Sequence, residues 1–288
     1  MFHTRSILPD KSPTYFQKIR PHASLQHLIK FYWVLKDESE EPPCPEWMLP
    51  DPYAELIFNL NKAPYQRMSQ AGQAEQLGAS YVVVSNGPPV KAARIETIDM
   101  VGVKLLPHAL QHMAQTSLHD LTQPVPMAFL QQPRLKNLEE RLSKAHSIME
   151  IRQLLDHAMF QLLEGIETPL FFEAMNWQVK SGGILAVNEL SQGLGIHIST
   201  LEKGFKKYCG ISPKRFQRMV RFRSFYQSFL KSAGQGTYPH FHDFGYFDQN
   251  HLIKEFKFFT GSAPGKIFNS PHSFEVTNQH FGREYWAF

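Results

Sequence analysis

One pattern occurs twice near the carboxyl-terminal end of the chain, and it constrains the fold more than any other feature. The first copy, GIHISTLEKGFKKYCGISPKRF, begins at Gly195, and the second, GYFDQNHLIKEFKFFTGSAPGKIF, begins at Gly245. Both follow the motif Gly-x-x-x-x-x-Leu-x-x-x-Phe-Lys, with one extra residue between Gly and Leu in the second copy. A glycine turn between two short helices is the helix-turn-helix signature. The repeat therefore predicts a protein that reads DNA.

Positive charge is concentrated in the same part of the chain. Residues 1–180 hold 17 Lys and Arg against 19 Asp and Glu, a net of −2, whereas residues 181–288 hold 13 against 7, a net of +6. Such a basic block is often only a solvated face, but beside the repeat it indicates a surface that faces DNA phosphates. The block consists of Lys203, Lys206, Lys207, Lys214, Arg215, Arg218, Arg221 and Arg223.

The length of 288 residues suits two domains. No run of about eighteen apolar residues occurs and the chain does not start with an apolar segment, so we expect no membrane span, no secretory signal and a cytoplasmic protein. The two cysteines, Cys44 and Cys209, lie far apart in the sequence. This favours reduced, buried thiols over a disulfide or a metal site.

The amino-terminal half changes its pattern part of the way along. From residue 28 to about 104 it consists of short apolar runs such as LIKFYWVL, AELIFNL and DMVGVKLL, broken by Pro, Gly and Asn, which predicts a β-rich sandwich or barrel. Helical stripes then begin at Leu110, Leu135 and Ile148. The third stripe has two interpretations, which are packing against the chain's own β-domain and formation of a dimer interface.

These patterns predict an α+β fold whose carboxyl-terminal domain is all-α. In that domain, a long helix from Pro213 to about Leu230 joins two helix-turn-helix units. The expected parts are a β-rich sensory or effector domain over 1–125, a helical linker and possible dimerisation region over 126–180, a double helix-turn-helix domain over 181–270, and an aromatic-rich tail over 271–288.

The second helix of each unit carries the candidate base contacts, because that helix enters the major groove with its amino-terminal side chains at the base edges. Gln and Asn make bidentate bonds to adenine, and Lys reaches guanine or a phosphate. The DNA-binding candidates are Ser199, Thr200, Glu202, Lys203 and Lys206 in the first unit and Gln249, Asn250, His251, Lys254 and Lys257 in the second. The phosphate-contact candidates are Lys207, Lys214, Arg215 and Arg218.

Two of these candidates have alternative roles. Glu202 could accept a hydrogen bond from cytosine or pair with Lys206 one helical turn away. His251 could contact a base or cap its helix, which is expected to start at the N-cap Asp248.

In the first unit, Gly204 in mid-helix costs about 1 kcal/mol relative to Ala, which predicts a less rigid helix.

Several segments resemble a known family. The segments LEKGFKKYCGISP, SPKRFQRMVRF and GYFDQNHLIKEFKFFTGSAP are similar to the DNA-binding domain of AraC/XylS bacterial transcription regulators over roughly 184–268. The segments RPHASLQHLIKFYWVL, LPDPYAELIFNL and GVKLLPHAL resemble sensory domains of one branch, which implies a cupin-like barrel that serves as an effector or dimerisation module. The resemblance implies base contacts at Ser199, Glu202, Lys203, Gln249, Asn250 and Lys254.

The chain also departs from the family pattern. The first helix of each unit usually carries a small residue, which here is Ser191 in one copy and the bulky Phe241 in the other. Phe241 predicts that the second unit packs differently or binds DNA weakly. Leu252 replaces the usual Phe, which is a mild change in the core.

The leading functional hypothesis is a sequence-specific transcription regulator that binds double-stranded DNA, is controlled by a small molecule or a subunit contact, and could form a homodimer. A second hypothesis is a cupin-type metalloenzyme using His108 and His112, which are four residues apart. No third ligand falls at a convincing spacing, so we predict no metal, cofactor or catalytic residue. Asp51 and Glu55 are expected to have structural roles at a strand start. A third hypothesis is a regulator that acts only through protein contacts.

Overall fold

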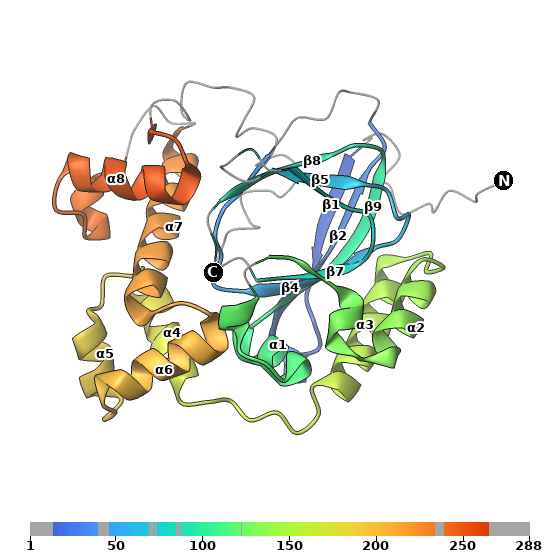
Figure 1. Ribbon diagram of the computed structural model, residues 1–288, viewed down its shortest axis with the longest axis horizontal. Coiled ribbons are helices and arrows are strands. Elements are labelled where there is room, and N and C mark those ends of the chain that lie inside the picture. Colours follow the sequence, from blue (N-terminus) through green and yellow to red (C-terminus); the bar gives the residue numbers. More distant parts are fainter. Residues whose placement is uncertain are drawn as a thin grey trace.

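The computed structural model describes residues 14–39, 46–68, 72, 74–84, 87, 89–121, 123–233 and 239–264. The predicted α+β class is confirmed, because a β-rich part precedes a helical part (Figure 1). Cys44 and the predicted tail over 271–288 lie outside the described residues. Among the described residues, no helix is both long and apolar enough to span a bilayer.

Two antiparallel sheets form the β-rich part. The larger sheet has the strand order β1-β2-β9-β4-β7-β10, and the smaller has the order β3-β8-β5-β6. The two sheets confirm the β-rich character expected from the short apolar runs, and the cupin-like assignment stays a prediction. The strands are β1 (Thr14–Ile19), β2 (Ile29–Asp37), β3 (Glu46–Met48), β4 (Ala54–Asn59), β5 (Tyr65–Met68), β6 (Ala74–Leu77), β7 (Tyr81–Val84), β8 (Val90–Arg94), β9 (Ile98–Leu105) and β10 (Val125–Pro126).

The two faces of the larger sheet pack in different cores. On β9, Met100 joins the core that contains Trp33, whereas Val101 and Val103 join the core shared with helices. This is the alternation that a strand with two buried faces requires. Gly102 pairs with Trp33 across β9 and β2. A Cβ atom at Gly102 would lie 2.0 Å from the indole Cε2, so the glycine is what allows the Trp33 ring to lie across the sheet.

Three helices cover the outer face of the larger sheet, and they are α1 (Pro107–Ala114), α2 (Pro133–Leu142) and α3 (Ile148–Leu162) (Figure 1). The stripe on α3 is buried in the same core as Leu56 and Val103 of the sheet. The stripe therefore packs against the chain's own β-rich part, which confirms the first of its two interpretations. Single 3-10 turns lie at η1 (Ala23–Leu25), η2 (Leu118–Asp120) and η3 (Met127–Leu130).

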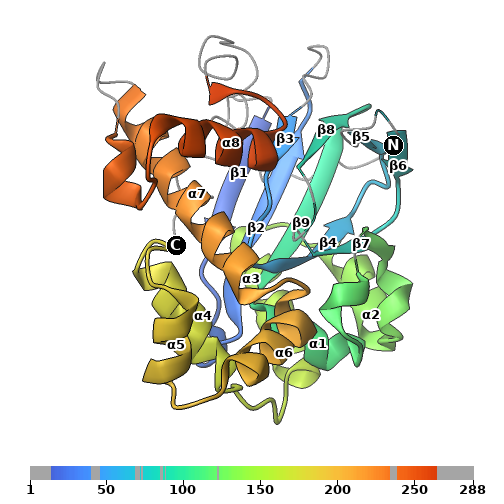
Figure 2. The same cartoon turned by 60° about the vertical axis from the view of Figure 1, so that its left-hand side comes forward.

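The helical part is arranged along one long helix, α7 (Pro213–Ala233). It has 21 residues, which is about 31 Å at 1.5 Å per residue, and it extends a few residues beyond its predicted end. Figures 1 and 2 both show α4, α5 and α6 at one end of α7 and α8 at the other. The remaining elements are α4 (Phe171–Lys180), α5 (Val187–Gly193), α6 (Ile198–Cys209), η4 (Phe241–Phe244) and α8 (Gln249–Thr260).

Candidate nucleic-acid interface

The two sequence repeats fold into two units with matching turns. Gly195 and Gly245 have φ angles of 63° and 69°, a region that favours glycine because it has no Cβ. The Gly195 N–H donates to Gln192 O at 3.1 Å, and the Gly245 N–H donates to His242 O at 2.9 Å. The equivalent glycines of the repeat therefore close equivalent turns before α6 and α8.

The helices that follow these turns also match. Both α6 and α8 have 12 residues. They end at Gly210 and Gly261, each with a φ of 73° and an N–H that donates to the carbonyl of the motif lysine. The motif residues Leu and Phe are buried in both helices. Each unit thus presents one amphipathic helix that packs against α7.

The elements before the two turns differ. In the first unit, the Ser191 hydroxyl donates to Ile196 O at 2.6 Å and ties α5 to the turn. Phe241 stands at the equivalent place in the second unit, where its phenyl ring has no group to donate. There the preceding element is η4, a four-residue 3-10 turn, instead of an α-helix. The bulky residue singled out in the sequence thus accompanies a shorter supporting element.

The candidate base contacts on α6 are all exposed, and they are Ser199, Thr200, Glu202, Lys203 and Lys206. The helix start is capped by His197, whose Nδ1 accepts from the Ser199 N–H at 3.3 Å. Gly204 lies on the opposite face, where an added Cβ would be 3.2 Å from Phe171 Cβ of α4. The glycine that weakens the helix therefore lets α4 approach α6 closely.

The candidates on α8 divide into two groups. Gln249, Asn250, Lys254 and Lys257 are exposed. His251 is half-buried, and its Nδ1 accepts from the Phe247 N–H at 3.3 Å. The predicted N-cap is confirmed, because Asp248 Oδ1 accepts from the His251 N–H at 2.6 Å. His251 is therefore engaged in holding the start of the helix, which favours the second of its two predicted roles.

The side chains of the basic block differ in their exposure and in their partners. Lys207 and Lys214 are exposed, as phosphate contacts require. The Arg218 guanidinium instead binds the buried Glu255 of α8 in bidentate fashion, with Nη2–Oε1 at 2.8 Å and Nε–Oε2 at 3.0 Å. Arg215 is half-buried, with its guanidinium 5.7 Å from the Phe258 ring. The phosphate roles of the two arginines stay predictions, and Arg218 also ties α7 to α8.

Two further arginines of the block hold helices in place. The Arg221 Nη2 donates to Gly183 O at 3.0 Å, which fixes α7 against the turn after α4. Arg223 is only 3% exposed. Our expectation that the whole block faces phosphate is therefore wrong for Arg223, because its charge lies within a protein contact.

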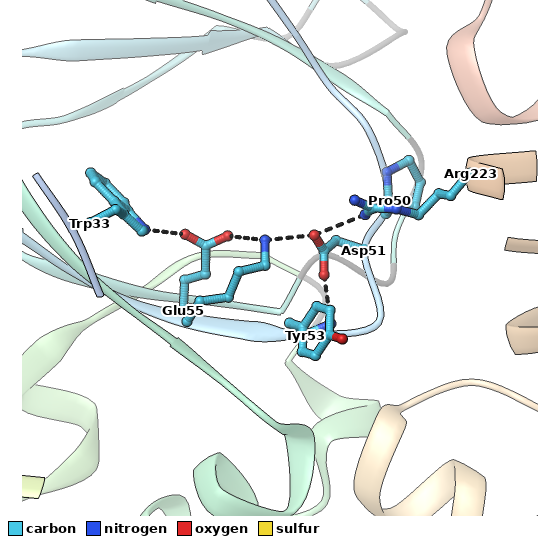
Figure 3. Close-up of polar contacts among 7 residues, drawn as sticks. Trp33, Pro50, Asp51, Tyr53, Glu55 and Arg223 are labelled. Atoms are coloured by element: carbon cyan, nitrogen blue, oxygen red, sulfur yellow. Dashed lines mark hydrogen bonds and ion pairs between the residues drawn. The ribbon is translucent and has the colours of Figure 1, made fainter. Parts of the chain in front are cut away.

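Arg223 joins α7 to the β-rich part (Figure 3). Its Nη1 lies 2.8 Å from Asp51 Oδ2 and donates to Pro50 O at 3.2 Å. The Asp51 carboxylate also accepts the Tyr53 N–H at 2.7 Å. Burial alone would raise the pKa of Asp51, but Arg223, Lys104 and the hydrogen bonds outweigh it, and the pKa lies below its ordinary value.

The contact continues into the sheet through Lys104. Its Nζ lies 2.6 Å from Asp51 Oδ2 and 3.0 Å from Glu55 Oε1, and the Trp33 Nε1–H donates to Glu55 Oε2 at 3.0 Å. We name this set, Trp33, Asp51, Glu55, Lys104 and Arg223, the interdomain network. Its two cations and two anions are buried together, which offsets part of the cost of removing charges from water. Asp51 and Glu55 have the structural role that was predicted.

Sequence reasoning missed the partners in this network. The available signal was Lys104, which interrupts the apolar run DMVGVKLL on a buried strand. A lysine in such a place needs a buried carboxylate. Nothing local in the sequence identified Arg223 as the second cation, because its block reads equally well as a solvated face.

Contacts with η2 and α4 hold the carboxyl-terminal end of α6. His119 Nδ1 of η2 lies 3.1 Å from Gly210 O at the end of α6. The Tyr208 ring of α6 stacks on Phe171 of α4 with a centroid distance of 4.2 Å. The end of α6 is thus docked, while its amino-terminal candidate contacts stay exposed.

The histidines of the metalloenzyme hypothesis do not converge. His108 is buried beside Phe172, with ring centroids 5.0 Å apart, whereas His112 is exposed. Burial, with a smaller contribution from His27, lowers the pKa of His108 to about 4. Over the part of the chain that the structure describes, no group of three or more His, Cys, Asp or Glu could hold a metal. Cys209 is buried, as predicted, and its thiol donates to Met175 Sδ at 3.5 Å.

We expect Arg223→Met to uncouple the two parts of the chain. The substitution leaves Asp51 with one cation fewer in a buried site, which costs about 3 kcal/mol, the lower end of the range for breaking a buried pair. In urea unfolding followed by tryptophan fluorescence and circular dichroism, the wild type should unfold in one transition and the variant in two. Lys214→Met, an exposed lysine on the same helix, should stay within about 0.5 kcal/mol of wild type. An Arg223→Met protein with an unchanged single transition would contradict this role.

We expect His108 to make the fold sensitive to acid. The folded chain resists protonation of His108 until about pH 4, whereas the unfolded chain takes up the proton near its ordinary pKa of 6.5. Stability should therefore fall as the pH drops from 6.5 to 4, by about 3 kcal/mol from this group. The free energy of unfolding of His108→Leu, measured across that range, should fall less steeply than that of wild type. If the free energies of unfolding of wild type and His108→Leu fell in parallel with pH, or if His112→Leu had the same effect, this role of His108 would be wrong.

A family model described as "Domain of unknown function (DUF6597)" matches residues 17–125. No curated protein matches the chain. A 1.65 Å structure of ToxT from Vibrio cholerae is similar at 9% identity and a TM-score of 0.46, covering 88% of this chain and 97% of that one.

Two further solved structures are similar to the chain at lower TM-scores. Unsaturated-fatty-acid-bound wild-type ToxT from Vibrio cholerae strain SCE256 is 12% identical with a TM-score of 0.42, covering 91% and 97% of the two chains. The AraC-like transcriptional activator CuxR is 10% identical with a TM-score of 0.30, covering 78% and 89%.

Proposed function

We propose that the chain is a sequence-specific, DNA-binding transcription regulator of the AraC/XylS type. The main support is the structural repeat. Two equivalent helices, α6 and α8, lie at opposite ends of α7 and expose polar side chains on their first turns. In a helix-turn-helix these are the side chains that meet base edges in the major groove. The parts predicted as 1–125, 126–180 and 181–270 serve as sensory domain, linker and reading domain.

The charge of the helical part supports binding to duplex DNA. The candidate contacts include six exposed lysines, which are Lys203, Lys206, Lys207, Lys214, Lys254 and Lys257. Each lysine that neutralises a phosphate releases a counterion, so affinity should fall steeply as salt rises. A protein that bound with the same affinity at low and high salt would not be using this surface.

The two reading helices have different chemistry. On α8, Gln249 and Asn250 suit adenine, and Lys254 suits guanine or a phosphate. On α6, Glu202 suits cytosine and Lys203 suits guanine or a phosphate. We therefore infer that one chain reads two unlike half-sites in successive major grooves.

The interdomain network supports control by the β-rich part. Asp51 and Lys104 hold α7 by its buried Arg223, and η2 holds the end of α6. A small molecule or a second subunit that bound the β-rich part and moved these groups would change the position of α6 relative to α8. Homodimer formation would place two such regulators on one operator.

The first experiment is selection of bound sequences from a random duplex pool, followed by gel-shift titration of the selected duplex at several salt concentrations. We expect one preferred sequence, bound at least a thousandfold more tightly than random duplex, with a steep loss of affinity as salt rises. Equal affinity for every duplex tested would contradict the proposal. Such a result would favour a regulator that acts through protein contacts.

We expect Lys254→Ala to weaken the preference at one base pair by about 1–3 kcal/mol, the value of one good base contact. Gel shifts with the selected duplex and a duplex changed at that pair provide the measurement. Lys214→Ala is the matched control, because it should weaken binding to all duplexes alike and lower the salt slope by about one. A Lys254→Ala protein with an intact preference and only reduced general affinity would make Lys254 a phosphate contact.

A further inference from the structure

A phenylalanine stands out at the start of α8. Phe247 is 83% exposed, which is more than any other large apolar side chain in the described ranges. Single exposed apolar residues are ordinary on protein surfaces, so exposure alone assigns no role. What distinguishes Phe247 is its place, immediately before the N-cap Asp248 and the exposed pair Gln249 and Asn250.

Phe247 is the residue by which the second unit is longer than the first. In the first unit, Gly195 is followed by Ile196 and by the N-cap His197. In the second unit, Tyr246 follows the glycine and is only 1% exposed, and Asp248 is the N-cap. Phe247 is therefore an inserted residue that contributes nothing to the core and projects from the turn.

The backbone at Phe247 is held firmly. Its N–H donates to His251 Nδ1 at 3.3 Å, and the His251 ring packs edge-on against Tyr246 at 5.4 Å. Tyr246 in turn packs against Phe225 of α7 at 5.9 Å. A phenyl group on a fixed backbone loses little conformational entropy on binding, which favours a recognition role.

We propose that Phe247 reads a thymine by packing its ring against the 5-methyl group in the major groove. This inference rests on the proposed function, since it requires α8 to enter that groove. Apolar side chains, including Phe, recognise thymine there through the methyl group, which the other three standard DNA bases lack. The nearby Gln249 and Asn250 suit hydrogen bonds to adjacent bases, and Lys254 and Lys257 farther along α8 suit the negative groove rather than an apolar protein partner.

The test replaces each thymine of the selected duplex, one at a time, by deoxyuridine, which lacks only the methyl group. At one position in the half-site read by α8, wild type should bind the deoxyuridine duplex about fourfold more weakly, the effect of one buried methyl. Phe247→Ala should bind both duplexes equally, and Phe247→Leu, which keeps an apolar side chain, should keep most of the discrimination. Phe160→Ala removes another exposed phenylalanine, on α3, and should behave as wild type.

The possible outcomes separate this inference from the proposed function. If wild type binds the selected duplex tightly but tolerates deoxyuridine everywhere, or selects no thymine in that half-site, the thymine contact is wrong and the regulator stands. If Phe247→Ala weakens thymine and deoxyuridine duplexes equally while wild type shows no difference, the ring contacts the DNA backbone. If wild type shows no sequence preference at all, both proposals fail.

Discussion

The buried ion pair between Arg223 and Asp51 is the interaction on which the arrangement of the chain depends. A guanidinium and a carboxylate are each costly to bury alone, so the two groups hold the long helix α7 and the β-rich part in one relative position. Lys104 and Glu55 extend the constraint into the sheet, where the indole of Trp33 donates to Glu55. The β-rich part and α7 can therefore pack in this position only when these buried charges are paired.

The helices α6 and α8 are fixed by different means, although the turns before them match. Gly204 and Glu255 occupy the same position, the seventh residue, of α6 and α8. Gly204 admits Phe171 of α4, so α6 is held by close packing near the β-rich part. Glu255 binds Arg218, so α8 is held by an ion pair to α7. The β-rich part contacts both α6, through η2, and α7, through Arg223, so a change there would reach α8 through α7.

Sequence reasoning predicted the features that depend on local signals. The glycine turns and the N-cap Asp248 follow from short motifs whose conformations the neighbouring residues determine. It could not predict Arg223 with Asp51, because residues separated by most of the chain leave no spacing pattern. It also treated Arg218 as a free charge, since nothing local shows that the residue opposite is a buried glutamate. Phe241 was identified as bulky, but the shorter η4 that accompanies it was not foreseen.

We propose that one chain places two unlike helices, α6 and α8, in successive major grooves. Hydroxyl-radical footprinting together with guanine-methylation interference on the selected duplex tests it directly. We expect two contacted major-groove segments of different sequence on one face of the duplex, with centres about one turn, or roughly 10 base pairs, apart. A single contacted segment for each bound chain, or contacts confined to the minor groove, would contradict it.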